Sequence, residues 1–291
     1  MISNTSALEN SPVFRSEPTP RVQLMNVTPE LAARWLMDCN TKNRCLSPQY
    51  AERLADEIRA NRWVLTHEGI AFSPGNILLD GQHRLMAIQL AGKSVDLYVW
   101  FDVSAKALLA INTGKPRQLH HTLSLARVCG DVDPYRVAVL RAMIAGRGHA
   151  RILSAGAAQH AMLRHDQAIE FALGQVPATI RFPGIATAVT RSIIARAWYS
   201  ADRQRIANFS KVLTTGIATS VYDRPAQMLF QFLLSHRGNS ESLRCERYGK
   251  TERALQAFLR GEPLAKLCAI RDEVFPLPEE TTLRAKGGKA A

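Results

Sequence analysis

The chain has 291 residues, 46% of them hydrophobic, and a formal net charge of +12 at pH 7. This size suffices for one or two domains with buried cores, and no apolar run approaches the roughly 18 residues that a membrane-spanning helix needs. Residues 1–20 lack the apolar centre of a signal peptide, and the five cysteines never form a Cys-x-x-Cys pair. The sequence therefore predicts a cytoplasmic protein with no disulfide framework, zinc knuckle or membrane partner.

Polar residues and three prolines predict a disordered arm over residues 1–20. Structure is expected to begin near Val22. Thr28-Pro29-Glu30 provides an N-cap, a proline at the first helical position and an acid in the first turn, which predicts a helix to about residue 38. Ser47-Pro48 repeats this device and predicts a helix to about residue 61. Apolar residues at intervals of four give that second helix a buried face that includes Tyr50, with Glu57 pointing outward.

Residues 69–72 and 77–79, joined by a Ser-Pro-Gly-Asn turn, predict a β-hairpin. A helix is then expected from the Asp80 turn to Gly92, followed by a strand over residues 95–101. Ser104 predicts the start of a short helix to Ile111. Together these elements indicate a compact α+β unit over residues 21–115.

Beyond Asn112 the strand signals disappear and apolar residues recur at helical spacing. The sequence predicts an all-helical domain over residues 116–280 and a disordered tail over residues 281–291. The expected helices span residues 118–129, 134–145, 155–173, 184–200, 202–215, 224–236, 249–260 and 263–274.

Residues Asp80-Gly81-Gln82-His83-Arg84-Leu85 stand where an apolar strand turns into a helix. A helix N-terminus leaves its first N–H groups unpaired and carries partial positive charge, and glycine lets a ligand approach the backbone closely. Arg84 and His83 add side-chain donors, and a planar guanidinium suits phosphate oxygens. The hexapeptide therefore predicts a phosphate-binding turn, with a plain turn and a solvated arginine as the alternative.

Acidic and basic residues near this turn are further candidates for the site. Asp80 is a candidate Mg²⁺ ligand or general base, and Glu68 is a candidate to join it across the pocket. For Asp80 the alternative is a turn residue that bonds backbone N–H groups. Arg44 is expected either to reach the same pocket or to form a surface ion pair. Thr113, Lys115 and Arg117 precede a helix and predict a second anion site, or else an interdomain linker.

Positive charge is concentrated in the second part of the chain. Residues 1–115 hold 12 basic and 11 acidic residues, a net charge of +1, whereas residues 116–291 hold 25 and 14, a net charge of +11. An arginine-rich helical region indicates contact with DNA or another polyanion. Arg244, Arg247 and Lys250 around Tyr248 predict a patch that stacks a base and holds phosphates, with a solvated helix end as the alternative.

The order of capped helix, hairpin, Asp80–Leu85 turn, helix and strand resembles the ParB/sulfiredoxin-like fold, and within it the phage and bacterial proteins that carry a DGQHR motif. Asn43-Arg44, residues 63–66 and residues 112–117 are similar to the same phage ParB-like proteins. The resemblance covers roughly residues 22–120. It implies a domain with a small mixed sheet in which Gly81, Gln82, His83 and Arg84 bind the phosphates of ATP or CTP, with Mg²⁺.

Two differences from these relatives limit what the resemblance implies. Sulfiredoxins are similar in having Gly-Cys-His-Arg at this turn, with the cysteine as nucleophile, but Gln82 stands there in this chain. An amide is not a nucleophile, so peroxiredoxin repair is not expected. The glutamate-led motif that helps ParB clamps to hold metal and nucleotide is not found in the helices after residue 118, so a sliding clamp is not expected either.

Together the sequence and the resemblance predict a DNA-associated ParB-like protein, encoded by a phage or mobile element, that binds a nucleoside triphosphate. Its expected chemistry is Mg²⁺-dependent hydrolysis or phosphoryl transfer in DNA modification or maintenance. The sequence is also compatible with a non-enzymatic DNA-binding regulator whose turn holds DNA phosphates. A third alternative is a metal-dependent nuclease that uses Asp80 and Glu68. A homodimer is compatible with all three.

Overall fold

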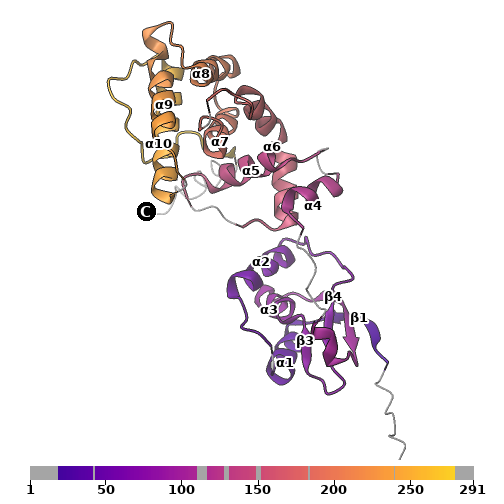
Figure 1. Ribbon diagram of the computed structural model, residues 1–291. Coiled ribbons are helices and arrows are strands. Elements are labelled where there is room, and N and C mark those ends of the chain that lie inside the picture. Colours follow the sequence, from indigo (N-terminus) through magenta and orange to yellow (C-terminus); the bar gives the residue numbers. More distant parts are fainter. Residues whose placement is uncertain are drawn as a thin grey trace, which may run out of the picture. The chain divides into compact units, whose positions relative to one another are not determined.

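The computed structural model describes residues 19–41, 43–109, 117–127, 131–148, 152–182, 184–238 and 240–278. Over these residues ten α-helices accompany one small four-stranded sheet, so the fold is mixed α/β (Figure 1). The chain divides into two compact units after residue 116. Within the described ranges, no helix is both long enough and apolar enough to cross a lipid bilayer.

The first unit contains the sheet. Its strands are Arg21–Val27 (β1), Ile70–Phe72 (β2), Leu78–Asp80 (β3) and Val95–Phe101 (β4), in the spatial order β1-β4-β2-β3. β1 pairs antiparallel with β4, β4 pairs parallel with β2, and β2 and β3 form the predicted hairpin. The expected small mixed sheet is therefore confirmed. The sequence analysis does not predict β1 as a strand.

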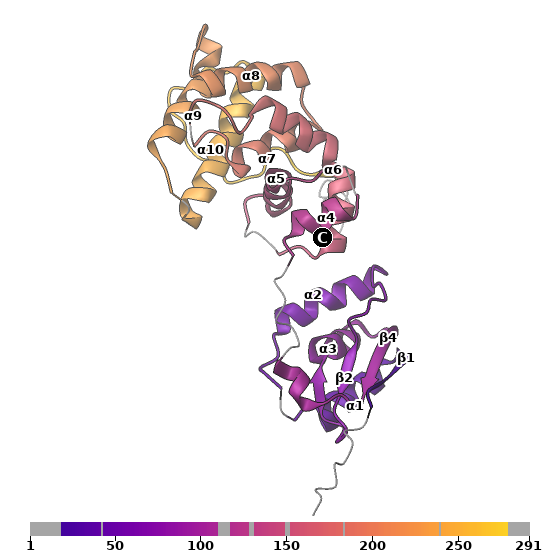
Figure 2. The ribbon, with the colours of Figure 1, turned by 45° about the vertical axis from the view of Figure 1, so that its right-hand side comes forward.

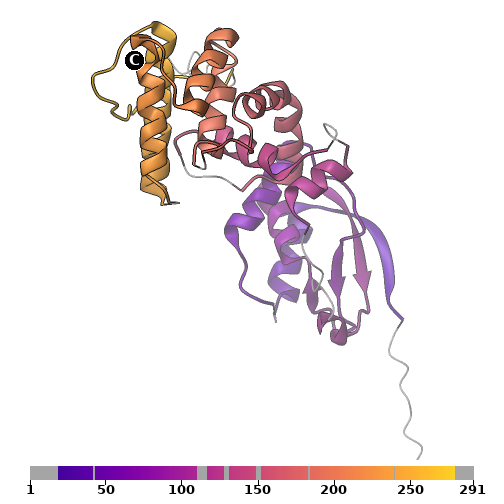
Figure 3. The same ribbon diagram turned by 45° about the horizontal axis from the view of Figure 1, so that its top comes forward.

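Helices Pro29–Cys39 (α1), Pro48–Arg59 (α2) and Gln82–Ala91 (α3) lie to one side of the sheet (Figures 1 and 3). The side chains of β4 alternate between the covered and the open face of the sheet. Leu97 and Val99 are buried in the core, whereas Asp96 and Trp100 are exposed. The 3-10 helix Ala105–Leu109 (η1) follows β4. A face of the sheet that bears Trp100 is thus left exposed to solvent.

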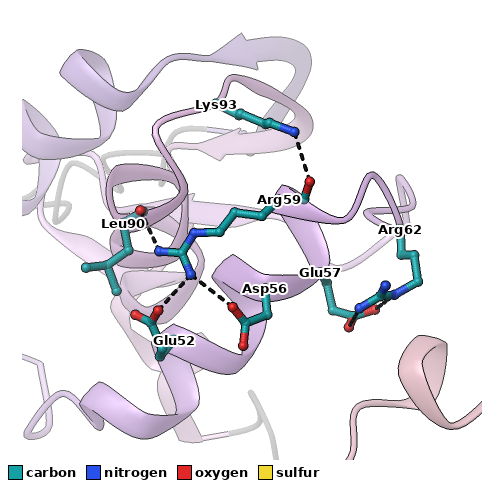
Figure 4. Close-up of polar contacts among 7 residues, drawn as sticks. All are labelled: Glu52, Asp56, Glu57, Arg59, Arg62, Leu90 and Lys93. Carbon is teal, nitrogen blue, oxygen red and sulfur yellow. Dashed lines mark hydrogen bonds and ion pairs between the residues drawn. The ribbon is translucent and has the colours of Figure 1, made fainter. Parts of the chain in front are cut away.

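Polar contacts join the C-terminal ends of α2 and α3 (Figure 4). The Arg59 guanidinium contacts the carboxylates of Glu52 and Asp56 at 2.7 and 2.9 Å and donates to the carbonyl oxygen of Leu90 at 2.8 Å. Lys93 donates to the carbonyl oxygen of Arg59 at 2.9 Å. These contacts satisfy helix-end carbonyls that would otherwise lack partners, so they fix α2 against α3.

Two expectations for α2 are wrong. Glu57, expected to point outward, is buried, and its carboxylate pairs with the Arg62 guanidinium at 2.7 Å. Tyr50, expected in the buried face, is 41% exposed, while Ala51, Ala55 and Ile58 are buried. The helix therefore turns the smaller Ala51 and Ala55 toward the core.

The second unit is helical over the described part of residues 117–278. Figure 2 shows the helices of this unit in sequence colours. Every residue of α7 from Thr190 to Ala197 is buried, so this helix runs through the core of the unit. The helices are Leu119–Leu125 (α4), Pro134–Ala145 (α5), Ala155–Gln175 (α6), Ala188–Ala197 (α7), Arg203–Thr215 (α8), Arg224–Ser235 (α9) and Glu241–Arg260 (α10), with the 3-10 helix Val221–Asp223 (η2) before α9.

The C-terminal part of this unit differs from the sequence prediction. Helix α10 begins at Glu241, capped by Ser240, eight residues before the predicted start. The helix predicted over residues 263–274 is wrong, because this segment has no regular secondary structure. Its backbone is held by side chains instead: the buried Arg196 donates to the carbonyl oxygen of Phe275 at 2.7 Å, and its guanidinium pairs with the Glu273 carboxylate at 2.9 Å.

Some expectations fall outside the described residues. These are the arm apart from residues 19 and 20, the tail over residues 281–291, the end of the short helix at Ile111, and Thr113 and Lys115 of the second anion site.

Candidate functional site

The turn between β3 and α3 is built around Gly81. Gly81 is the N-cap of α3 with a φ of 105°, a conformation that side chains rarely adopt. A Cβ at this position would lie 2.9 Å from Cγ1 of Ile70. Thr28 and Ser47 cap α1 and α2 with side-chain oxygens, but no side chain caps α3. Within the described part of the chain, no side chain accepts from the first N–H groups of α3.

Arg84, in the first turn of α3, contacts both carboxylates that the sequence predicts for the site. Its guanidinium contacts the Glu68 carboxylate at 2.5 Å and the Asp80 carboxylate at 3.6 Å, and it donates to the carbonyl oxygen of Gly69 at 3.0 Å. The Arg84 side chain is mostly covered, with 19% exposed. The structure thus brings Glu68, Asp80 and Arg84 together, as the sequence analysis expects.

Glu68 and Asp80 also line a pocket of about 310 Å³ on the exposed side of the sheet. Trp100, with 39% of its surface exposed, lines the same pocket, as do His67 and Pro20. Trp100 is not among the site residues that the sequence predicts. The available signal was the alternation of β4, which places this large aromatic residue on the same outward face as Asp96.

Gln82 and His83 point into the protein. The Gln82 side-chain amide donates to the carbonyl oxygen of Arg44 at 3.0 Å and accepts from Asn40 at 3.3 Å. Nε2 of His83 accepts from the backbone N–H of Ser47 at 3.0 Å. Both side chains are buried and bonded within the protein, and phosphate binding by either of them stays a prediction. They attach the segment before α2 to the beginning of α3.

The surroundings of His83 lower the pKa of its imidazole. Burial lowers the pKa of His83, the positive charges of Arg44 and Arg84 lower it further, and the Asp80 carboxylate acts in the opposite direction. A neutral imidazole suits the acceptor role of Nε2. Arg44 itself is exposed, and no ion pair involving it is formed among the described residues. The site therefore contains a positive charge that has no acidic partner in the described part of the chain.

The described residues hold no cluster of three or more His, Cys, Asp and Glu side chains suited to a metal ion. Glu68 and Asp80 provide two carboxylates. Mg²⁺ commonly takes one or two protein carboxylates and completes its shell with phosphate oxygens and water. The pair therefore fits a metal that arrives with a phosphate-bearing ligand. Arg117 is exposed and belongs to the second unit.

The predicted nucleic-acid patch in α10 is wrong. Tyr248 is fully buried in the core and cannot stack on a base. Arg244 donates to the carbonyl oxygen of Gly146 at 2.9 Å. Arg247 donates to a loop carbonyl, and Lys250 pairs with a neighbouring carboxylate on the same helix. These cations serve the packing of the unit, and the alternative of a solvated helix end does not hold for Tyr248 either.

Comparison of the chain with protein-family models, with curated proteins and with solved structures finds no match. The resemblance to the ParB/sulfiredoxin-like fold stays a prediction that rests on the residues of this chain. The geometry provides an uncapped helix N-terminus, a guanidinium held by two carboxylates, and a pocket lined by an indole ring. Such a set suits a ligand that carries both phosphate and an aromatic ring.

Proposed function

We propose that the first unit binds a nucleoside triphosphate at the Asp80 turn, and that the protein acts in association with DNA. The observation that carries the proposal is the position of Arg84, which lies at the uncapped N-terminus of α3 and contacts both carboxylates that line the pocket. A helix N-terminus with an adjacent arginine binds phosphate oxygens through the backbone N–H groups and the guanidinium.

Each part of the nucleotide has a matching group in this arrangement. The triphosphate takes the N–H groups of α3 with Arg84 and Arg44, and the base lies against the exposed indole of Trp100. Glu68 and Asp80 would hold Mg²⁺, and the ion would supply positive charge that neutralises the phosphates. When the triphosphate binds, it replaces Glu68 as the partner of Arg84. ATP and CTP are the first candidates, because the resemblance to ParB-like proteins of phages implies them.

Association with DNA follows from the net charge of +11 in residues 116–291. Some of these basic residues make contacts within the protein and not with a partner, since Arg196 is buried and Arg244 donates to loop carbonyls. The remaining exposed cations are the candidates for phosphate contacts. A ParB-like protein of this kind, possessing nucleotide and DNA sites in separate units, would act in the cytoplasm on DNA modification or maintenance.

A second candidate function is a DNA-binding regulator without nucleotide chemistry. It is favoured by the internal bonds of Gln82 and His83 and by the ion pair of Arg84 with Glu68, which complete the turn without a ligand. In this case the turn is a structural element, and function resides in DNA binding by the second unit.

A thermal-shift experiment separates the two candidates. The full-length protein is heated with ATP, CTP, GTP or UTP, each with and without Mg²⁺. A nucleotide at 100 times its Kd is expected to add roughly 2.7 kcal/mol to the free energy of unfolding. Arg84→Ala should weaken binding by about 2 kcal/mol, because a charge-assisted contact is lost. Arg34→Ala, at an exposed arginine of α1, is the matched control and should bind as the wild type does. No shift with any nucleotide would reject nucleotide binding and favour the regulator.

A further inference from the structure

Helix α8 has one exposed polar face and one buried apolar face. Gln204, Asn208 and Lys211 are exposed and follow one another at intervals of four and three, so they lie along one side of the helix. Phe209 and Leu213 are buried on the other side, in the core of the second unit. The helix is therefore fixed by its apolar side and presents an ordered row of polar side chains to solvent.

The charges on α8 are all positive. The helix contains Arg203, Arg205 and Lys211 and no acidic residue. The acid just before it, Asp202, is the N-cap and accepts from the backbone N–H of Arg205 at 2.8 Å. Among the described residues none of the three cations forms an ion pair. Their positive charge is therefore not offset by direct ion pairs in the described structure, and it adds to the field that attracts a polyanion.

This absence of acidic partners contrasts with other helices of the chain. On α2 the exposed Arg59 contacts two carboxylates, and on α10 Lys250 pairs with Glu246 at 2.7 Å. Both of those helices carry acidic residues that pair with their cations. The exposed side of α8 instead combines cations with the amides of Gln204 and Asn208, which is the composition of a surface that contacts nucleic acid.

The side chains of this row, and the two arginines that flank it on either edge, are held in position. The Arg203 guanidinium lies over the Trp198 ring, 4.3 Å from its centroid. Arg205 donates to the carbonyl oxygen of Phe258 at 3.3 Å, and the amide of Gln204 donates to the side-chain oxygen of Asn208 at 3.2 Å. Ordering these groups before binding reduces the entropy that a complex would otherwise lose.

An aromatic residue lies beside the basic end of α8. Tyr222, from η2, is 55% exposed and lines a pocket of about 330 Å³ together with Arg205 and Asn208. A phenol next to a guanidinium can donate to a phosphate oxygen or pack against a deoxyribose. Tyr222 therefore adjoins the polar row of α8 at Asn208.

We propose that the exposed side of α8, defined by Arg203, Gln204, Arg205, Asn208, Lys211 and Tyr222, is the surface that binds duplex DNA. This proposal rests on the proposed association with DNA and names its site. An α-helix fits the major groove, where the cations and Tyr222 contact phosphates. Gln204 and Asn208 face the base edges, and their amides are suited to adenine.

The test measures binding of the full-length protein to a fluorescein-labelled duplex of mixed sequence, about 25 base pairs long, by fluorescence anisotropy over a salt series. Arg203→Ala and Lys211→Ala are each expected to weaken binding about tenfold at 0.1 M salt and to lower the slope of log K against log [salt] by about one. Arg141→Ala removes an exposed arginine of α5 and is the matched control, expected to bind as the wild type does.

Gln204→Ala and Asn208→Ala test the base contacts. In a selection from a randomised duplex library, each variant is expected to lose preference at one or two positions while its salt slope stays that of the wild type. Wild-type binding that is unchanged by Arg203→Ala and Lys211→Ala would overturn the proposal for α8 and leave DNA association intact. No duplex binding by the wild type would overturn both. Equal binding of duplex RNA would overturn the major-groove assignment, because that groove is too narrow in RNA.

Discussion

The carboxylate of Glu68 lies 2.5 Å from the guanidinium of Arg84, and the two residues differ in their freedom to move. The Glu68 side chain is 64% exposed, whereas 19% of the Arg84 side chain is exposed and its guanidinium also donates to the carbonyl oxygen of Gly69. Glu68 can therefore rotate away while Arg84 stays in place. The ion pair competes with any anion that approaches the N-terminus of α3.

Glu68→Gln tests this competition. Without Mg²⁺ the variant should bind ATP or CTP a few-fold more tightly than the wild type, because an exposed ion pair worth up to about 1 kcal/mol no longer has to be broken. With Mg²⁺ the gain should disappear, because the variant has also lost a metal ligand. Isothermal titration under both conditions measures the effect. Glu52→Gln, which removes an exposed carboxylate bound to Arg59, is the control. A gain that persists in Mg²⁺ would contradict a metal-binding role of Glu68.

Gln82→Ala should lower the free energy of unfolding of the first unit by about 2 kcal/mol. The change removes a buried amide and leaves the carbonyl oxygen of Arg44 and the Asn40 amide without these partners. Gln89→Ala, at an exposed position of the same helix, should change stability by less than about 0.5 kcal/mol. Urea denaturation measures both variants. Equal stabilities would show that the contacts of Gln82 do not hold the turn.

Glu252→Gln should make the second unit more stable at alkaline pH. Burial raises the pKa of Glu252 from 4.5 to about 7, so the folded protein binds more protons than the unfolded chain between these values. The contribution of Glu252 to the free energy of unfolding should therefore fall as the pH rises from 4.5 to 7, by at most roughly 3 kcal/mol, so the variant gains stability relative to the wild type over this range. Glutamine keeps an acceptor for the N–H groups of Val274 and Phe275 without this proton dependence.

Thermal unfolding from pH 4 to pH 8 measures this effect. Glu246→Gln, at an exposed carboxylate paired with Lys250, is the control and should keep the slope of the wild type in this window. If the difference in stability between Glu252→Gln and the wild type does not grow between pH 4.5 and 7, Glu252 is not the group that titrates in this window.

His165 should give a pH dependence of opposite sign. Burial lowers the pKa of His165 from 6.5 to about 4, and Nδ1 of His165 lies 2.7 Å from the Tyr199 hydroxyl. The unfolded chain binds more protons between these values, so stability is present above pH 6.5 and is lost as the pH falls toward 4. The Glu252→Gln variant lacks the opposing pH dependence of Glu252, so in this variant the loss of stability caused by His165 should be measured by itself. Replacing His165 by glutamine should remove it, and His160→Gln, at an exposed position, should not.

The regular elements of the fold could be predicted because their signals are local. Thr28 and Ser47 lie directly before the helices that they cap, and Gly92 lies directly after α3. The prediction of a helix in the segment after α10 is wrong. Its apolar residues recur at helical spacing, but its backbone groups bond to the side chains of Arg196 and Glu252. Such long-range partners leave no trace in the local pattern.

The candidate site also combines features that the sequence predicts with features that it does not. The strand, glycine and helix around Gly81 are contiguous, so the turn and the grouping of Asp80 with Arg84 follow from the sequence. The inward orientation of Gln82 and His83 does not, since their partners Asn40 and Ser47 are 42 and 36 residues away. Tyr248 was misassigned because the polar start of α10 conceals that this residue lies in the middle of a helix packed on the core.

The contacts of Arg196 have a consequence for synthesis on the ribosome. This buried guanidinium needs the carbonyl oxygen of Phe275 and the Glu273 carboxylate, both nearly 80 residues further along the chain. During translation α7 emerges long before these partners exist, and a buried charge without them is strongly unfavourable. We expect the second unit to stay incompletely folded until residues 273–275 have left the exit tunnel. A chain that stalls before this point would expose the apolar surface around α7 to chaperones and proteases.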